Sequence, residues 1–192
     1  IKNACEIGEG LKDELSDREF SLALNVSPRQ FRQKGFSEKV LEAIERHQLP
    51  RGLIELELTE GLLIEDVDDT VAKMLVLREQ GVRFSIDDFG TGYSSLTYLK
   101  HLPARKIKID QSFVRDMLVD NDDLAIVRGV IGLSEAFRRT VIAEGVETIE
   151  HGKKLVEMGC ELAQGYGIAK PMPANEVPAW LAQWRPEKDW QI

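Results

Sequence analysis

The sequence predicts an α/β fold in which a parallel sheet is covered by helices. Short apolar runs alternate along the chain with segments of helical periodicity, as in repeated strand–helix units. Most of these runs are rich in Val, Ile, Leu or Phe, as buried parallel strands are. Six such units fit either an open sheet or a barrel.

Six runs have the character or the position of strands. They are Phe20–Val26, Leu53–Thr59, Arg83–Asp87, Arg105–Ile109, Thr140–Glu144 and Glu161–Gln164. The last run is placed mainly by its spacing from the others.

Helices are predicted between the strands and before the first of them. Helical patterns cover residues 1–14, Val71–Leu77, Leu124–Phe137 and Glu147–Met158. Gly81 and Gly159 follow two of these helices, where glycine commonly ends a helix.

The composition indicates one globular domain over residues 1–192. Of its charged residues, 25 are Lys or Arg and 33 are Asp or Glu, so the net charge is 25 − 33 = −8, which argues against DNA or RNA as the main partner. Cys5 and Cys160 form neither a disulfide framework nor a zinc motif, and we expect a reducing, cytoplasmic location. No apolar run approaches the ~20 residues that span a bilayer, so we expect no membrane contact by this domain.

Each predicted strand ends in a polar side chain suited to metal or phosphate chemistry. These side chains are Asn25, Glu57, Asp87 with Asp88, Lys108, Glu144 and Gln164. Any one of them alone has an ordinary structural explanation, because strands lead into solvated loops. In a strand–helix barrel, however, the carboxyl ends of all strands build one site, so the repetition predicts a functional centre.

The predicted centre has an excess of negative charge. Four carboxylates give −4 and Lys108 returns +1, which leaves −3. Two carboxylates about 4 Å apart repel by roughly 4 kcal/mol at an effective dielectric of 20, so the cluster needs cations. Oxygen ligands without His or Cys favour Mg²⁺ or Mn²⁺. A pair of such ions about 3.5–4 Å apart is the usual device for phosphodiester hydrolysis.

These residues, in this order, resemble the EAL family of cyclic di-GMP phosphodiesterases. The matching segments are Asn25–Phe31, Glu57–Glu60, Asp87–Leu96, Lys108–Asp110, Glu144–Glu147 and Gln164–Tyr166. The resemblance implies a TIM-like (β/α) barrel of the EAL type and hydrolysis of cyclic di-GMP to linear pGpG with two Mg²⁺ or Mn²⁺ ions.

The resemblance also implies a role for individual residues. Metal ligands would be Asn25, Glu57, Asp87, Asp88 and Glu144, and Lys108 would hold or polarise the attacking water with help from Glu144. Gln164 would line the same pocket. Arg29 and Pro171 are further candidates for substrate contact, although a helix-start Arg and a rim Pro also have ordinary structural explanations.

The resemblance also implies that one loop connects the metal site to a dimer interface. In the family the loop that corresponds to Phe89–Leu96 couples metal binding to a dimer contact, and the glutamate at Glu60 holds it. Because both parts are intact here, the resemblance favours an enzyme over a degenerate nucleotide receptor.

The Glu-Ala-Leu motif that names the family is absent from the 192 residues. Glu42-Ala43-Ile44 is similar but lies downstream of Asn25, whereas the family's motif lies on an earlier strand and its Glu binds metal. TIM barrels have about 250 residues, and we therefore expect the two N-terminal strands to be missing and metal affinity and turnover to be weakened. Open sheet edges predict a homodimer or a strand-exchanged oligomer.

Two alternatives to the enzyme remain open. One is a receptor or regulatory module that binds cyclic di-GMP without cleaving it. The other is a barrel lyase that uses Mg²⁺ and Lys108 as a base, which the full motif set disfavours. Fused regulatory domains are expected in the parent protein.

The remaining histidines and tryptophans carry no predicted function. His47, His101 and His151 lie at unrelated spacings, and we expect them at the surface or at helix caps. Trp180 and Trp184 share one face of the last helix, a geometry more typical of core packing than of base stacking.

Overall fold

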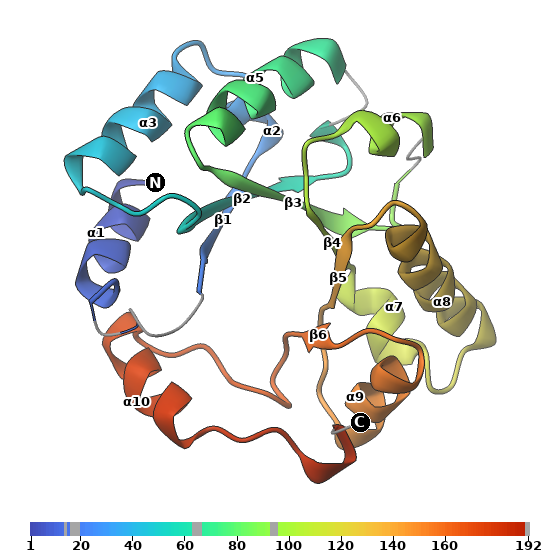
Figure 1. The fold of residues 1–192 in the computed structure, drawn as a ribbon. Helices are drawn as coiled ribbons and strands as arrows, with labels where there is room; N and C mark the ends of the chain where they lie inside the picture. The colour runs from blue at the N-terminus through green and yellow to red at the C-terminus, as the bar shows by residue number, and fades with distance from the viewer. Residues whose placement is uncertain (14, 16–19, 63–66, 93–95, 191–192) are drawn as a thin grey trace.

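The computed structural model contains a parallel sheet of six strands that lie side by side in chain order (Figure 1). It describes residues 1–13, 15, 20–62, 67–92 and 96–190. The strands are β1 (Leu22–Val26), β2 (Ile54–Thr59), β3 (Arg83–Phe89), β4 (Lys106–Ile109), β5 (Thr140–Ala143) and β6 (Leu162–Ala163). The prediction of six parallel strands is therefore confirmed, although β6 is only two residues long.

Helices follow or precede the strands throughout. In the described residues the α-helices are α1 (Lys2–Leu11), α2 (Pro28–Phe31), α3 (Phe36–Arg46), α5 (Val67–Glu79), α6 (Leu96–His101), α7 (Gln111–Asp116), α8 (Asn121–Ala136), α9 (Ile149–Glu157) and α10 (Val177–Gln183). Two short 3₁₀ helices are Ala174–Glu176 and Lys188–Trp190. Beyond α5 and α9 the chain turns at Gly81 and Gly159, both with positive φ, as the sequence predicts.

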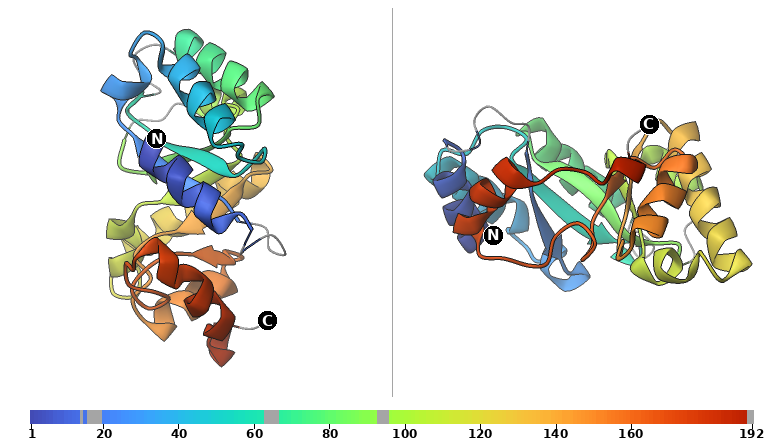
Figure 2. Two further views of the ribbon diagram at one scale, coloured as in Figure 1. Left: turned by 90° about the vertical axis from the view of Figure 1, so that its left-hand side faces the viewer. Right: turned by 90° about the horizontal axis from the view of Figure 1, so that it is seen from below.

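The sheet curves through the molecule with helices along its outer side (Figures 1 and 2). Helix α5 packs on β3, α8 packs on β4 and β5, and α3 contacts both α5 and α1. Among the described residues β1 pairs only with β2 and β6 only with β5, so these two strands form the edges of the sheet. Within the same residues, no helix combines the length and the apolar character that crossing a membrane requires.

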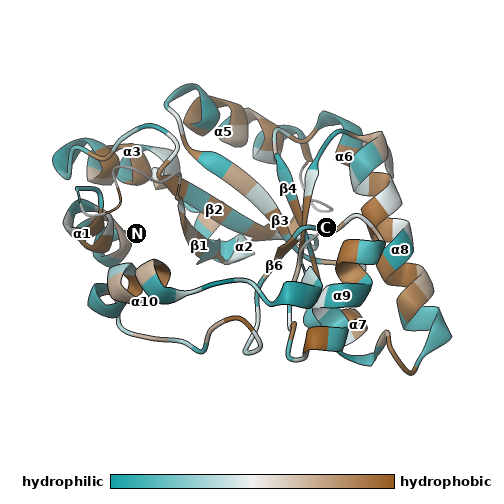
Figure 3. Ribbon diagram, turned by 60° about the horizontal axis from the view of Figure 1, so that its bottom comes forward, coloured by the Kyte–Doolittle hydropathy of each residue, from teal (hydrophilic) through white to brown (hydrophobic). Residues whose placement is uncertain are grey.

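Side-chain alternation along the strands separates the apolar core from the polar interior. Leu56 and Leu58 on β2 are fully buried against the helices, as are Ile107 and Ile109 on β4, and β2 and β3 carry much of the brown colour in Figure 3. The residues between them alternate to the inner face: Glu55, Glu57, Lys106 and Lys108. A period of two thus brings three buried charged side chains, and the half-buried Lys106, to the inner face of the sheet.

The expectation for His151 is wrong. Its side chain is only 6% exposed and its Nε2 lies 3.1 Å from the backbone oxygen of Arg115. His151 shares the buried face of α9 with Leu155, four residues on, and that helical spacing overrides the polarity of the imidazole. By contrast, His101 is exposed, and His47 lies at the C-cap of α3, where it forms an ion pair with Glu9.

Trp180 and Trp184 contact each other but do not belong to the apolar core. The rings of Trp180 and Trp184 have centroids 5.8 Å apart, and both residues are half-buried. Their mutual contact fits the predicted shared face, while the core itself is formed by the sheet and the helices that cover it.

Candidate active site

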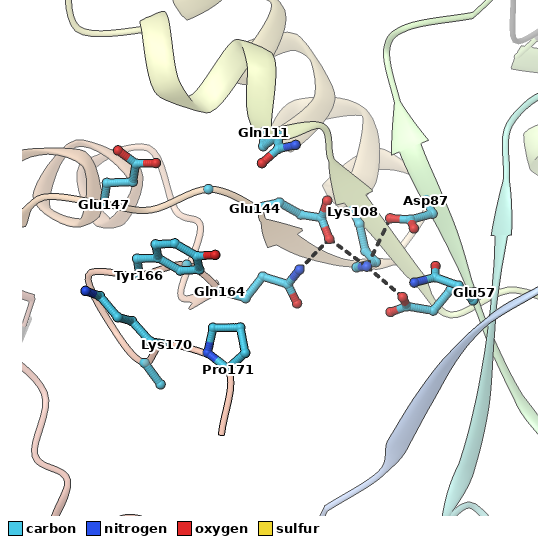
Figure 4. Close-up of a pocket in the computed structure, with 14 residues that line it drawn as sticks. Glu57, Asp87, Lys108, Gln111, Glu144, Glu147, Gln164, Tyr166, Lys170 and Pro171 are labelled. Atoms are coloured by element: carbon cyan, nitrogen blue, oxygen red, sulfur yellow. Dashed lines mark hydrogen bonds and ion pairs between the residues drawn. The ribbon is translucent and has the colours of Figure 1, made fainter. Parts of the chain in front are cut away.

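The carboxyl ends of the strands surround a cavity of about 630 Å³ (Figure 4). The predicted site residues that line it are Asn25, Glu57, Asp87, Lys108, Glu144, Gln164 and Pro171. They come from six successive strands or the loops that follow them, which is why residues 146 positions apart meet in one place. The volume lies within the range of small-ligand and cofactor sites, roughly 300–1,000 Å³.

Lys108 is the centre of this cluster. Its ammonium lies 2.9 Å from Glu57, 3.0 Å from Asp87 and 2.6 Å from Glu144, and its side chain is only 4% exposed. These three carboxylates come from β2, β3 and the end of β5, on either side of β4. One buried ammonium therefore offsets part of the charge of three converging carboxylates.

Two amide side chains complete the ring. The amide end of Asn25 lies 3.2 Å from Glu57 Oε2 and 3.0 Å from Asp87 Oδ2, and with its nitrogen turned inward it donates to both. With its oxygen turned inward, the same amide adds a neutral ligand for a cation. Gln164 Nε2 donates to Glu144 Oε1 at 2.6 Å, which ties β6 to the cluster.

Asp88 reaches the cluster through an irregularity in β3. Consecutive residues of a regular strand point to opposite faces, but the pairing of β3 with β4 shifts between Ile86 and Phe89, and Asp88 has a φ of +53°. As a result, carboxylate oxygens of Asp87, Asp88 and Glu144 all lie within 4.8 Å of one another. Left-handed backbone at a non-glycine residue is strained, and such strain gathers at functional sites.

Burial and mutual repulsion alter the protonation of the acids. Burial raises the pKa of Glu57 and of Glu144, although their hydrogen bonds to Lys108 oppose this effect. Burial also raises the pKa of Asp88, with further contributions from the charges of Asp87 and Asp110. These carboxyl groups are therefore harder to ionise than free acids, as expected for a cluster that lacks sufficient positive charge.

Lys108 responds in the opposite sense. Burial by itself lowers the pKa of this lysine, but the hydrogen bonds to Glu144, Glu57 and Asp87 outweigh burial and raise it. The amine therefore stays protonated at neutral pH. This state suits stabilisation of negative charge and disfavours the lyase alternative, which needs a neutral lysine base.

The chemistry of the donor set fits a hard divalent cation. Asp87, Asp88 and Glu144 offer three carboxylate oxygens, with Glu57 and the amide oxygen of Asn25 beside them. All of these ligands are oxygens, which Mg²⁺ and Mn²⁺ prefer. A bound ion would also relieve the repulsion that raises the pKa of the acids.

Glu60 lies behind the site and contacts the loop after β3. Its side chain is 2% exposed, its Oε2 accepts a hydrogen bond from the Gly90 amide at 3.2 Å, and its backbone amide donates to Asp87. A Cβ at Gly92 would lie 2.9 Å from Glu60 Oε1, so a side chain at this position would displace the Glu60 carboxylate. Tyr93, Ser94 and Ser95 of the predicted coupling loop lie outside the described residues.

The structure separates Arg29 from the other candidates and adds residues that the sequence analysis missed. Arg29 is exposed on α2 and does not line the cavity, so its substrate role stays a prediction. The added lining residues with polar side chains are Gln111, Glu147, Tyr166 and Lys170. Each follows a strand end by a few residues, so a search of whole loops, rather than of last strand residues, would have found them.

Asp110 is a further residue near the site that had no predicted role. It lies just beyond β4, caps α7 by accepting a hydrogen bond from Ser112 N at 2.8 Å, and its negative charge adds to the effect of burial in raising the pKa of Asp88. The sequence indicated this residue only by its position, two residues after Lys108 and just beyond the predicted strand. Asp110 thereby acts on Asp88 through its charge and on the first turn of α7 through its cap.

Comparison with known proteins identifies the family. The family model described as EAL domain matches residues 1–171. The chain is 40% identical over 164 residues to the bifunctional diguanylate cyclase/cyclic di-GMP phosphodiesterase MucR of Pseudomonas aeruginosa, covering 85% of this chain and 24% of that protein. It is 38% identical over 164 residues to the cyclic di-GMP phosphodiesterase NbdA of the same species, covering 85% of this chain and 21% of that one.

Solved structures agree with the sequence comparison. The MucR phosphodiesterase in complex with c-di-GMP has a TM-score of 0.88 at 38% identity and covers 92% of this chain and 71% of its own. The EAL domain of Mycobacterium smegmatis DcpA also has a TM-score of 0.88, at 39% identity. The match covers 97% of this chain and 83% of the DcpA chain. The chain spans about a quarter of the length of the curated relatives that it matches. The fold, the strand-end site and these matches together show that the chain belongs to the EAL domain family.

Proposed function

We propose that this chain hydrolyses cyclic di-GMP to linear pGpG in the strand-end cavity. The observation that carries the proposal is the convergence of Glu57, Asp87 and Glu144 on the Lys108 ammonium at 2.6–3.0 Å. The named activity of MucR and NbdA and the nucleotide complex of MucR support the choice of substrate.

Five residues would hold two Mg²⁺ or Mn²⁺ ions, namely Asn25, Glu57, Asp87, Asp88 and Glu144. Ions bound there would supply a water of lowered pKa and would offset the charge of the phosphodiester. The acids alone repel an anionic nucleotide, because the cluster of four carboxylates and Lys108 has a formal charge of −4 + 1 = −3.

The protein's own groups then position the reactants. Lys108 holds its proton and stabilises negative charge that develops on the attacking oxygen or on the phosphate. Glu144, fixed by both Lys108 and Gln164, orients the water. Pro171 and Tyr166 line the cavity on the far side of Gln164 from Lys108, where a base of the nucleotide would rest (Figure 4).

The wider setting is part of the same proposal. The chain would act as one catalytic domain of a larger protein, because it spans only 24% of MucR. A cytoplasmic location is a further part of the proposal. Regulatory domains elsewhere in that protein would control the activity, and cyclic di-GMP would be the ligand of this domain.

The test is product analysis with the chain in excess over cyclic di-GMP, so that even slow turnover converts the nucleotide. We expect pGpG with Mn²⁺ or Mg²⁺ and none after chelation. Asp87→Asn abolishes the product, whereas Asp116→Asn, at an exposed pair with Arg115, retains it. Binding of cyclic di-GMP without metal, with no pGpG under any condition, would instead identify a receptor.

A further inference from the structure

A second pocket of about 220 Å³ lies at the opposite end of the strands from the carboxylate cluster. Among the described residues its lining includes four arginines, Arg51, Arg78, Arg83 and Arg105, and no acidic residue. Arg51, Arg83 and Arg105 precede or begin β2, β3 and β4, and Arg78 lies in the last turn of α5. Along β3, Arg83 and Asp87 are four residues apart, which separates the two sites by about 13 Å.

The concentration of positive charge is unusual for this chain. The whole chain has a net charge of −8, yet the described charged side chains that line this pocket sum to a formal charge of +4. Arg51, Arg78 and Arg105 are exposed, and Arg83 is half-buried. In the described part of the chain no acidic side chain pairs with Arg78 or Arg105. The repulsion that Arg78 and Arg105 experience from the neighbouring guanidinium groups is therefore not offset by an acidic side chain of the described residues, which favours an anion beside them.

Two glycine turns give the pocket its shape. Gly52 and Gly81 have φ values of +84° and +94°, and the Gly52 amide donates to the Gly81 oxygen at 2.8 Å. A Cβ on Gly52 would lie 2.8 Å from the Arg83 guanidinium, and one on Gly81 would lie 2.8 Å from Cβ of Arg51. The paired turns thus leave room for both arginines at the mouth of the pocket, and a side chain at either glycine would displace them.

Arg51 shows how the backbone orients one of these groups. Its Nη2 donates to the backbone oxygen of Glu79, at the end of α5. This contact holds the guanidinium near the last turn of α5, where Arg78 also lies. The planar guanidinium forms bidentate contacts with phosphate, for which lysine is a weaker match.

From this arrangement we infer that the arginine pocket binds a pyrophosphoryl group, either free or as the phosphate tail of a nucleotide. A charge of +4 matches two linked phosphates better than a single carboxylate. The volume is below the usual range for whole drug-sized ligands, roughly 300–1,000 Å³, so it fits the phosphates rather than an entire dinucleotide. The inference concerns a site separate from the proposed catalytic centre and does not depend on it.

Calorimetric titration of the metal-free chain with inorganic pyrophosphate tests the inference. Removal of metal keeps the carboxylate cluster negative, so that it repels the probe. We expect one pyrophosphate per chain, bound more weakly as salt rises. Arg78→Gln and Arg105→Gln each weaken binding by at least about tenfold, because each removes a charge-assisted hydrogen bond. Arg128→Gln, at an exposed position on α8, leaves the affinity unchanged.

Two further ligands identify what is recognised. Tricarballylate has three carboxylates but no phosphate, and we expect it to bind much more weakly than pyrophosphate. A nucleoside diphosphate that binds as well as pyrophosphate, or better, places the phosphate tail in the pocket with the nucleoside outside. No binding of pyrophosphate, equal losses in all three arginine variants, or equal affinity for tricarballylate would overturn the inference.

Discussion

Lys108 is surrounded by more negative charge than one ammonium can offset, and this imbalance governs the residues around it. Glu57, Asp87 and Glu144 all lie within 3.0 Å of its nitrogen. Without this lysine, the buried carboxylates would lose their cation and would have to take up protons or a metal ion.

Replacement of Lys108 by Met tests that dependence. We expect the metal-free variant to lose about 3 kcal/mol of unfolding free energy, because buried charges are left unpaired. Mn²⁺ then raises the melting temperature of Lys108→Met more than that of the original chain. Lys154→Met, which breaks an exposed pair with Glu157, costs less than about 1 kcal/mol. Equal melting temperatures of Lys108→Met and the original chain without metal contradict the account.

The strained Asp88 makes a second prediction at the residue scale. Asp88→Gly removes both the left-handed strain and the repulsion from Asp87 and Asp110, so the metal-free chain gains about 1 kcal/mol while its Mn²⁺ affinity falls. Arg138→Gly is a matched control, since Arg138 also has a φ of +53° but lies away from the site. The control relieves strain without loss of metal affinity. If thermal unfolding and metal titration show the same changes in both variants, Asp88 has no role in the site.

At the scale of elements, Glu60 connects the end of β2 to the loop that follows β3. It accepts a hydrogen bond from Gly90, three residues after Asp87. The loop that Glu60 holds thus begins directly after Asp87 and Asp88. Replacement of the Glu60 side chain should therefore alter metal binding indirectly, through the position of this loop.

Glu60→Ala tests this connection by hydrogen exchange. We expect exchange of the Gly90 amide to accelerate by at least about tenfold, because a hydrogen bond to a charged group is lost. Mn²⁺ affinity falls at the same time. Glu38→Ala, at an exposed position of α3, alters neither quantity. Unchanged exchange at Gly90 in the Glu60 variant counts against a stabilising role.

Elements were easier to predict than the details of the site. Apolar runs and their spacing predicted all six strands, since burial of a parallel sheet demands such runs. The second carboxylate of β3 was a different case, because Asp88 reaches the site only through the shifted register after Ile86. A period of two would point Asp87 and Asp88 to opposite faces. Both were assigned to the site because they stand at the end of the predicted strand Arg83–Asp87, and the resemblance agreed with that assignment. Likewise Glu147 and Tyr166 lie in loops, whose course no periodicity describes.

At the scale of the whole molecule, the two edges of the sheet are the main feature. In the described residues β1 and β6 each have one strand partner, and unpaired strand edges attract other chains. We therefore predict that the 192-residue chain forms dimers or larger strand-exchanged assemblies. Light scattering after size-exclusion chromatography measures this directly. A single monomeric species across the accessible concentration range contradicts the prediction.

The two ends of the strands divide the molecule by charge. Carboxylates gather at the carboxyl ends around Lys108, and arginines gather at the amino ends of β2, β3 and β4. This polarity is consistent with divalent cations at one end and a phosphate-bearing anion at the other.

The most direct test of the account is the location of Mn²⁺ by anomalous scattering from crystals of this chain. The account predicts manganese between Glu57, Asp87, Asp88 and Glu144, with the Lys108 ammonium displaced from at least one of its three carboxylates. Manganese bound only elsewhere, with Lys108 still bonded to all three carboxylates, would contradict it.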